Sequence, residues 1–213
     1  MMKTDDLIDV LARDLAPVRP HALRIRLACA IGLGIIGAIV ALVVSLSVRP
    51  HLHQVTEAAF WVKFLYTAML MTAATVALGR VARPDGSIVP MVGVALGALA
   101  ILAILAIAQL ARSPTASYPS LIFGFSAVIC PFLIALFGLP AFFANIWFLR
   151  RGAPMNPSLA GFVAGACAGA TGGWVYSWAC VENGMPFIAL WYTLGILLSG
   201  ALGAWVGKFS LRW

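Results

Sequence analysis

Six long apolar stretches occupy most of this chain, and about 26 residues at the N-terminus form its main hydrophilic segment. Of 213 residues, 62% are hydrophobic and 10% are charged, whereas a soluble domain has about 25% charged residues. Each stretch exceeds the roughly 18 apolar residues that indicate a membrane-spanning helix. Long unbroken runs also exclude a porin-like barrel, whose strands alternate. We therefore predict an all-α membrane protein, a six-transmembrane-helix bundle. The predicted spans are residues 27–48, 59–79, 89–111, 121–149, 159–181 and 187–207.

The positive charges lie mostly on one side of the predicted bundle, so residues 1–26 form a cytoplasmic segment ahead of a transmembrane domain at 27–213. The net charge is +7, but these residues flank the apolar runs and set topology, so they do not indicate nucleic-acid binding. The opposite loops contain only Arg49 and Arg112. Both termini are therefore predicted to be cytoplasmic. The basic residues of the cytoplasmic side are Lys3, Arg13, Arg19, Arg24, Arg26, Arg80, Arg83, Arg150, Arg151, Lys208 and Arg212.

Small residues recur every fourth position in the last two spans. Residues four apart share one face of a helix, and small faces let helix backbones approach closely in lipid. We expect these two spans to pack tightly and to be joined by a short loop; a hinge or pore lining is the alternative. The residues are Gly161, Gly165, Gly169 and Gly173, then Gly195, Ser199, Gly203 and Gly207.

Polar residues are sparse within the spans. Lys63 lies about four residues from the start of its span, so its ammonium is expected to reach the outer surface. The absence of Asp or Glu from the predicted spans argues against a proton-coupled transporter. The fourth span is longer than one bilayer, so residues 119–129 are expected to form an outer extension or a surface turn. Pro131 is expected to kink the chain there.

Two of the four cysteines, Cys130 and Cys180, fall near the outer ends of their spans. An oxidising compartment permits a disulfide or a reactive pair there. His51, His53 and Glu182 are candidate additional ligands for a soft metal, although their spacing is not that of a zinc site. The histidines are otherwise ordinary loop residues. The sequence has no CxxC motif, which disfavours a dedicated thiol oxidoreductase.

The N-terminal segment contains a predicted short amphipathic helix at residues 4–15. Leucine and isoleucine side chains at helical spacing form one stripe, and Pro17 and Pro20 end the helix. Such a short helix is not stable alone in water, so it needs a surface. Membrane-surface helices are rich in Lys and Arg, whereas this helix is acidic and fits a basic protein groove better. The alternative is a surface helix without a partner.

Several stretches together resemble one known family. They are the opening MKTDDLIDVLARDLAPVRP, the six spans, the Cys130-Pro131 step and the segment CVENGMPFIALWYTLGI from Cys180 to Ile196. The chain resembles the NrsF family, the negative regulators of sigma factor F, along essentially its whole length. One departure is Val181, where we expect proline in many members.

This resemblance implies an anti-sigma factor of the bacterial inner membrane. Its partner would be an extracytoplasmic-function sigma factor, released under metal or oxidative stress. The resemblance assigns sensing to Cys130 and Cys180. It assigns sigma binding to the N-terminal segment, where we select Asp5, Asp6, Leu7, Leu11 and Asp14.

Two other classes remain as alternatives, a small transporter or channel and a membrane thiol oxidoreductase. The sequence contains no recognisable catalytic constellation and no cofactor motif. We therefore predict a regulator, not an enzyme, with no cofactor. Its expected partners are the sigma factor and the lipid bilayer.

Overall fold

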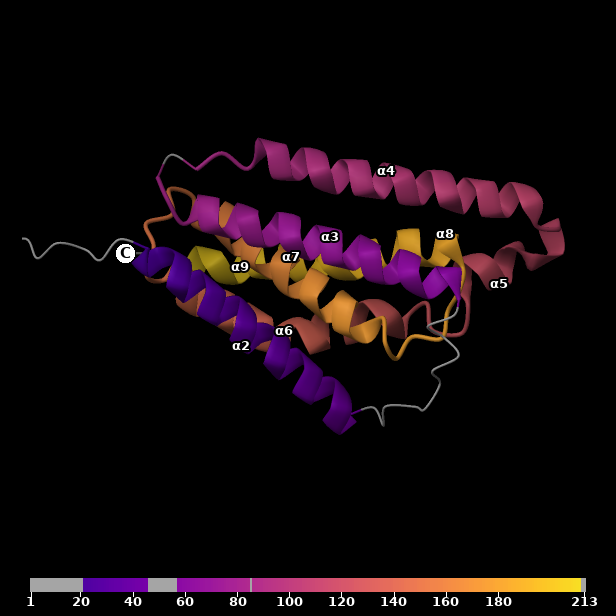
Figure 1. Ribbon diagram of the computed structural model, residues 1–213, viewed down its shortest axis with the longest axis horizontal. Coiled ribbons are helices and arrows are strands. Elements are labelled where there is room, and N and C mark those ends of the chain that lie inside the picture. The colour runs from indigo at the N-terminus through magenta and orange to yellow at the C-terminus, as the bar shows by residue number, and fades with distance from the viewer. Residues whose placement is uncertain (1–20, 46–56, 85, 212–213) are drawn as a thin grey trace, which may run out of the picture.

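The computed structural model describes residues 21–45, 57–84 and 86–211, and this part of the chain is helical with no strand. Six helical segments are long and apolar enough to cross a membrane, which confirms the predicted six-helix bundle (Figure 1). These are α2 (Ala22–Ser45), α3 (Ala58–Val81), α4 (Val89–Arg112), α6 (Ile129–Leu149), α7 (Pro157–Tyr176) and the continuous segment Met185–Ser210. The last comprises α8 (Met185–Phe187), the π-helical turn η3 (Ile188–Tyr192) and α9 (Thr193–Ser210).

The predicted N-terminal helix falls outside the described residues, which begin at His21. Helix α2 starts at Ala22, so the end of the segment predicted at 1–26 already belongs to the first spanning helix. The proposed sigma-binding residues stay predictions for the same reason; they are Asp5, Asp6, Leu7, Leu11 and Asp14.

The fourth span starts later than residue 121. The short helices η2 (Thr115–Ser117) and α5 (Tyr118–Phe123) come first, and α6 begins only at Ile129. Gly124 separates them, because its φ of 52° lies in the left-handed region that side chains other than glycine rarely adopt. Pro131 therefore sits in the first turn of α6, where its missing N–H costs no helix hydrogen bond, instead of kinking a longer helix.

Helix α7 is the most buried of the six spans and packs most extensively against α9. A Cβ added to Gly161 would overlap the carbonyl oxygen of Gly203, and one added to Gly203 would overlap that of Gly161. Gly165 meets the backbone of Ser199 in the same way. The glycine spacing therefore correctly predicts direct backbone contact between the last two spans.

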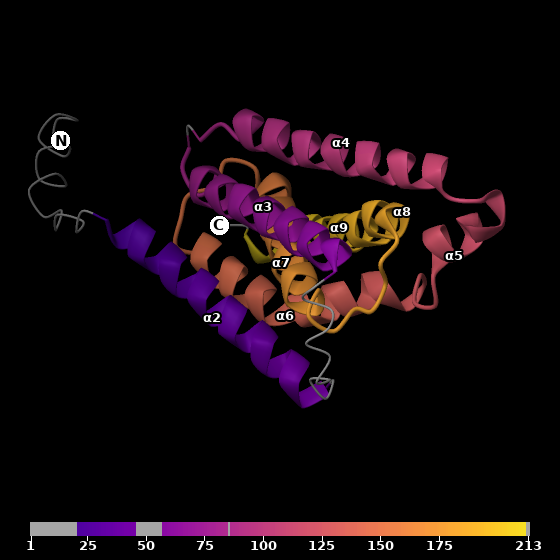
Figure 2. The same ribbon diagram turned by 45° about the vertical axis from the view of Figure 1, so that its right-hand side comes forward.

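Helix α2 packs mainly on α6 through a second close approach. A Cβ at Gly34 would lie 2.8 Å from the Cα of Ala141, and one at Gly37 would lie 2.6 Å from the Cβ of Pro140. The N-terminal segment is thus joined to a helix that contacts chiefly one neighbour. Figure 2 shows α2 lying across α6 at one edge of the bundle.

Helix α4 lies along the opposite edge, beside α3 (Figures 1 and 2). Its buried residues are only Ala98, Leu102 and Ala106, which form a single stripe. The α3–α4 and α6–α7 connections lie at one end of the bundle, which we call the basic end. Its basic residues are Arg24, Arg26, Arg80, Arg83, Arg150, Arg151 and Lys208.

Candidate functional site

Cys130 and Cys180 meet at the end of the bundle opposite the basic end. Cys130 lies in the first turn of α6, and Cys180 lies four residues after α7 ends at Tyr176. Their thiols are hydrogen-bonding neighbours, and both cysteines are free. They are 0% and 2% exposed, respectively. The sequence places the two cysteines at similar depth. The structure brings them together and buries both beneath the surface of the protein.

Lys63 from α3 completes this site. Its side chain is 1% exposed, and its ammonium donates hydrogen bonds to the carbonyl oxygens of Cys180 at 2.7 Å and Glu182 at 2.8 Å. The expectation that Lys63 reaches the outer surface is thus wrong. Two backbone carbonyls in the loop between α7 and α8 provide the polar environment that the bilayer would not. Lys63 fixes this loop to α3.

The electrostatic environment favours the thiolate form of Cys180. The hydrogen bond with Cys130 lowers the pKa of the Cys180 thiol, and the positive charge of Lys63 acts in the same direction. Burial opposes both effects because an apolar environment disfavours a charged group. Cys180 is therefore the better nucleophile or soft-metal ligand of the pair.

Glu182, a candidate metal ligand, instead holds the turn before α6. Its Oε1 accepts hydrogen bonds from the backbone N–H of Phe125 at 2.8 Å and from the hydroxyl of Ser126 at 3.1 Å. A Cβ at Gly124 would overlap this carboxylate, so both this contact and the positive φ exclude a side chain at position 124. Glu182 thus couples the loop of Cys180 to the turn that precedes Cys130.

The described residues contain no group of three or more His, Cys, Asp or Glu side chains placed to hold a metal ion. His51 and His53 lie outside the described residues. Any metal bound to the described part of the site would therefore depend on the two thiols as its strong protein ligands.

The π-helical turn η3 contributes Trp191 and Tyr192, which belong to the segment that carries the family resemblance. The Trp191 indole donates to the carbonyl oxygen of Ile122 at 2.8 Å and so holds α5 against η3. Tyr192 is fully buried, and its hydroxyl neighbours the Cys180 thiol without a closer partner among the described residues. A π-turn is rare and often occurs at functional sites.

Two further contacts close this end of the bundle. Gln109 of α4 accepts a hydrogen bond from the backbone N–H of Met185 at 2.7 Å. The Asn183 amide also donates to the Glu57 carboxylate just before α3. A reagent reaching the thiols must therefore displace a loop that is hydrogen-bonded on several sides. Lys63, Gln109 and Tyr192 were not assigned to this site from the sequence. Lys63 and Gln109 were visible as polar side chains within apolar spans, and Tyr192 lies in the segment that carries the family resemblance.

The whole chain is similar to proteins of one family. The profile of the family NrsF, described as negative regulator of sigma F, matches residues 11–213. The chain belongs to the NrsF family. This is a family of regulators, not of enzymes.

Two relatives of the NrsF family match over the full length of both chains. The chain is 38% identical over 217 residues to the "Anti-sigma-F factor NrsF" of Caulobacter vibrioides. It is 39% identical over 214 residues to the "Probable anti-sigma-F factor NrsF" of Azospira oryzae. No solved structure matches the chain.

Proposed function

We propose that this protein is an inner-membrane anti-sigma factor that holds an extracytoplasmic-function sigma factor and releases it when a metal or an oxidant acts on Cys130 and Cys180. The observation that carries the proposal is the full-length similarity to the anti-sigma-F factor of Caulobacter vibrioides. Membership of a family of regulators favours this function over a transporter or a thiol oxidoreductase. The arginines at the basic end support cytoplasmic termini.

The sigma factor is bound by the N-terminal segment. This segment combines a leucine and isoleucine stripe with four aspartates at positions 5, 6, 9 and 14. An acidic amphipathic helix fits an apolar groove with a basic rim, in which the ordering of the helix is coupled to binding. Asp5, Asp6, Leu7, Leu11 and Asp14 make the principal contacts.

The two thiols are the site at which a metal or an oxidant acts. Hydrogen peroxide would convert them to a disulfide, taking two electrons and yielding two water molecules. A soft divalent metal such as Cd²⁺ would instead bind both as thiolates and release two protons. Either event changes the contacts of Cys180 with Lys63 and Tyr192, and so moves the loop against α3 and η3.

Helix α6 transmits the change to the N-terminal segment. Cys130 lies in its first turn, and α6 is the principal packing partner of α2. Gly34 brings the backbone of α2 against that of Ala141, and Gly37 brings it against the rigid ring of Pro140, so a displacement of α6 cannot be absorbed by flexible side chains there. Helix α2 leads directly into the N-terminal segment, whose affinity for the sigma factor falls in the displaced state.

Co-purification tests the binding step. The sigma factor encoded beside this protein's gene is expected to be recovered with the wild-type membrane protein and lost with Leu7→Asp/Leu11→Asp. The matched control is Leu197→Asn on α9, a substitution outside the N-terminal segment. Equal recovery of the sigma factor with the Leu7/Leu11 variant would refute the assignment of this segment.

A sigma-dependent reporter tests the sensing step. Cys130→Ser and Cys180→Ser are expected to abolish induction by cadmium, chromate and peroxide, whereas Cys29→Ser, at the other end of the bundle, retains it. Cys29 is exposed at the basic end and lies far along the chain from the pair. Induction that persists in both site variants would remove the pair from the mechanism.

A further inference from the structure

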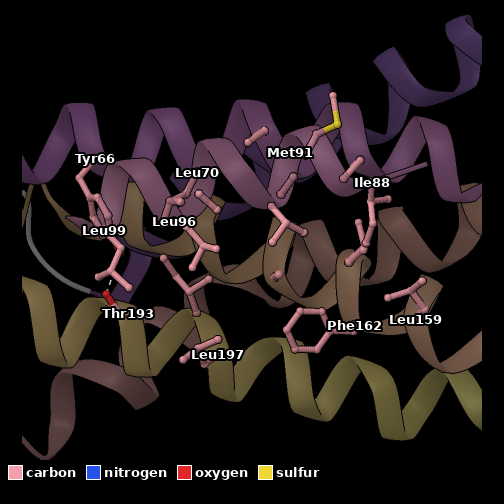
Figure 3. Close-up of a pocket in the computed structure, with 18 residues that line it drawn as sticks. Tyr66, Leu70, Ile88, Met91, Leu96, Leu99, Leu159, Phe162, Thr193 and Leu197 are labelled. Atoms are coloured by element: carbon pink, nitrogen blue, oxygen red, sulfur yellow. Dashed lines mark hydrogen bonds between the residues drawn. The ribbon is translucent and has the colours of Figure 1, made fainter. Parts of the chain in front are cut away.

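A cavity of about 480 Å³ lies between α3, α4, α7 and α9, away from the cysteine site. Figure 3 shows its lining, to which Leu70, Met91, Leu96 and Phe162 contribute. This volume is within the range of roughly 300–1,000 Å³ of small-molecule sites. The cavity exists because α4 packs on α3 and on the α8–η3 region but stands apart from α7 and α9 over the rest of its length.

The lining is almost entirely hydrocarbon. Its polar side chains are Tyr66 and Thr193, whose hydroxyl groups hydrogen-bond to each other at 2.7 Å at one end of the cavity. Because one hydroxyl group donates to the other, the inner end of the cavity offers a ligand at most one further O–H donor. A ligand with a polar head inserted first, such as a quinone ring with its two carbonyl oxygens, would bury more polar atoms there than this end can pair. The chemistry of the lining therefore favours an aliphatic chain.

The cavity extends to a depth of about one lipid leaflet. Along α3 its lining runs from Tyr66 to Ala77, and along α4 it runs from Ile88 to Leu99. Eleven residues of helix rise about 16 Å, roughly half of the 30 Å hydrocarbon core of a bilayer. Ala77 lies one turn from the end of α3, so the cavity begins at the basic end and ends near the middle of the bundle.

Positive charge stands beside its entrance. The exposed Arg80 lies in the last turn of α3, and the exposed Arg83 lies in the loop that follows. This loop also carries Asp85, which lies outside the described residues. The guanidinium of Arg80 donates to the carbonyl oxygen of Ser87 at 3.1 Å, which keeps it beside Ile88 in the cavity wall. Guanidinium groups at a membrane surface attract phosphate headgroups, and anionic lipids most strongly.

From these four features we propose that the cavity binds one acyl chain of an anionic phospholipid, whose phosphate pairs with Arg80 and Arg83. Moving an acyl chain from the bilayer into the cavity gains little free energy from apolar burial, because lipid tails are as apolar as leucine. Selectivity therefore comes from the headgroup, and retention comes from filling space that would otherwise lack packing contacts. The bound lipid acts as a wedge that fixes α4 relative to α7 and α9. This site is independent of the proposed anti-sigma function.

Native mass spectrometry of the full chain tests the site with defined lipids. The protein is purified in detergent and mixed separately with phosphatidylglycerol, phosphatidylcholine and ubiquinone. The wild type is expected to retain one phosphatidylglycerol per chain, with about tenfold or greater preference over phosphatidylcholine. Arg80→Gln/Arg83→Gln removes this preference, whereas Arg112→Gln at the other end of α4 leaves it intact.

A second pair of variants tests the cavity itself. Ala95→Phe places a ring in the cavity and is expected to abolish the adduct. Gly97→Phe is the matched control on α4, because a Cβ at Gly97 meets no atom within 4 Å and this residue does not line the cavity. Unchanged retention in Ala95→Phe would overturn the proposal, as would retention of ubiquinone in preference to phospholipid.

Labelling of the wild-type protein makes the test independent of whether the variants fold. Phosphatidylglycerol with a photoreactive group on its acyl chain is expected to modify peptides of α3 and α4 that line the cavity, in excess over the exposed face of α2. Uniform labelling of all lipid-facing helices would refute a specific acyl-chain site.

Discussion

The close contact between α7 and α9 predicts that one added methyl group, in Gly165→Ala, destabilises the protein. In Gly165→Ala the added Cβ would lie 2.8 Å from the carbonyl carbon of Ser199 and 3.0 Å from the Cα of Gly200. Ordinary contacts of a Cβ begin at 3.4 Å. The added Cβ would overlap the carbonyl oxygen of Ser199 more closely still, so the two helices must separate by more than the 0.6 Å obtained by subtracting 2.8 from 3.4. All three obstructing atoms belong to the backbone, so no side-chain rotation relieves the overlap.

The energetic cost follows from that separation. A gap of about 0.5–1 Å removes a quarter to a half of the dispersion attraction across a packed contact. Overpacking in a tightly packed interior costs about 1–3 kcal/mol. A chain of 150–250 residues loses about 2–4 °C of Tm per kcal/mol, so Gly165→Ala is expected to melt roughly 2–12 °C below a Gly→Ala variant without overlap, which shares the gain in helix propensity.

The assay is thermal unfolding of the purified full chain in detergent, followed by tryptophan fluorescence. Gly32→Ala is the matched control, because an added Cβ at Gly32 meets no atom within 4 Å. Alanine is about 1 kcal/mol more favourable than glycine inside a helix, so the control is expected to equal or exceed the wild-type Tm. Equal Tm values for Gly165→Ala and Gly32→Ala would refute direct backbone contact between α7 and α9.

Three further predictions concern the cysteine site and its connection to α2. The rate at which iodoacetamide alkylates Cys180, measured by peptide mass spectrometry, is expected to rise with pH around a midpoint below the ordinary thiol pKa of about 8.5. The reason is that the lowered pKa of Cys180 makes the reactive thiolate available at lower pH. A midpoint at or above about 8.5 would contradict the assigned environment. Lys63→Met is expected to shift this midpoint upward and to reduce Tm, because two buried carbonyl groups lose their donor. Lys63→Arg keeps the positive charge and is expected to retain part of the lowered midpoint. An unchanged midpoint in Lys63→Met would exclude an electrostatic role of Lys63. Gly34→Ala, which separates α2 from α6, is expected to change cadmium induction of a sigma-dependent reporter by about fivefold or more, while Gly32→Ala has little effect. Identical induction in both variants would refute transmission of the signal from α6 to α2.

The sequence alone determined the class of fold, because hydropathy is a local property. Each spanning segment is continuous along the chain, so its apolar character can be recognised without knowing its neighbours. The same holds for the contact of α7 with α9, because glycines four apart always share a helix face. The N-terminal boundary of α6 was harder to predict, since Gly124 ends α5 through a positive φ within an otherwise apolar run.

Tertiary structure alone decided the composition of the cysteine site. Depth along the spans and the family resemblance both point to Cys130 and Cys180, but Lys63 and Cys180 lie 117 positions apart in the chain. No local pattern shows that a lysine from α3 reaches the carbonyl oxygens of the loop after α7, or that Glu182 holds the turn before Cys130. Such contacts depend on the relative rotation and offset of helices, which side-chain packing sets. The sequence determined which segments enter the membrane, and packing decided which polar groups meet between them.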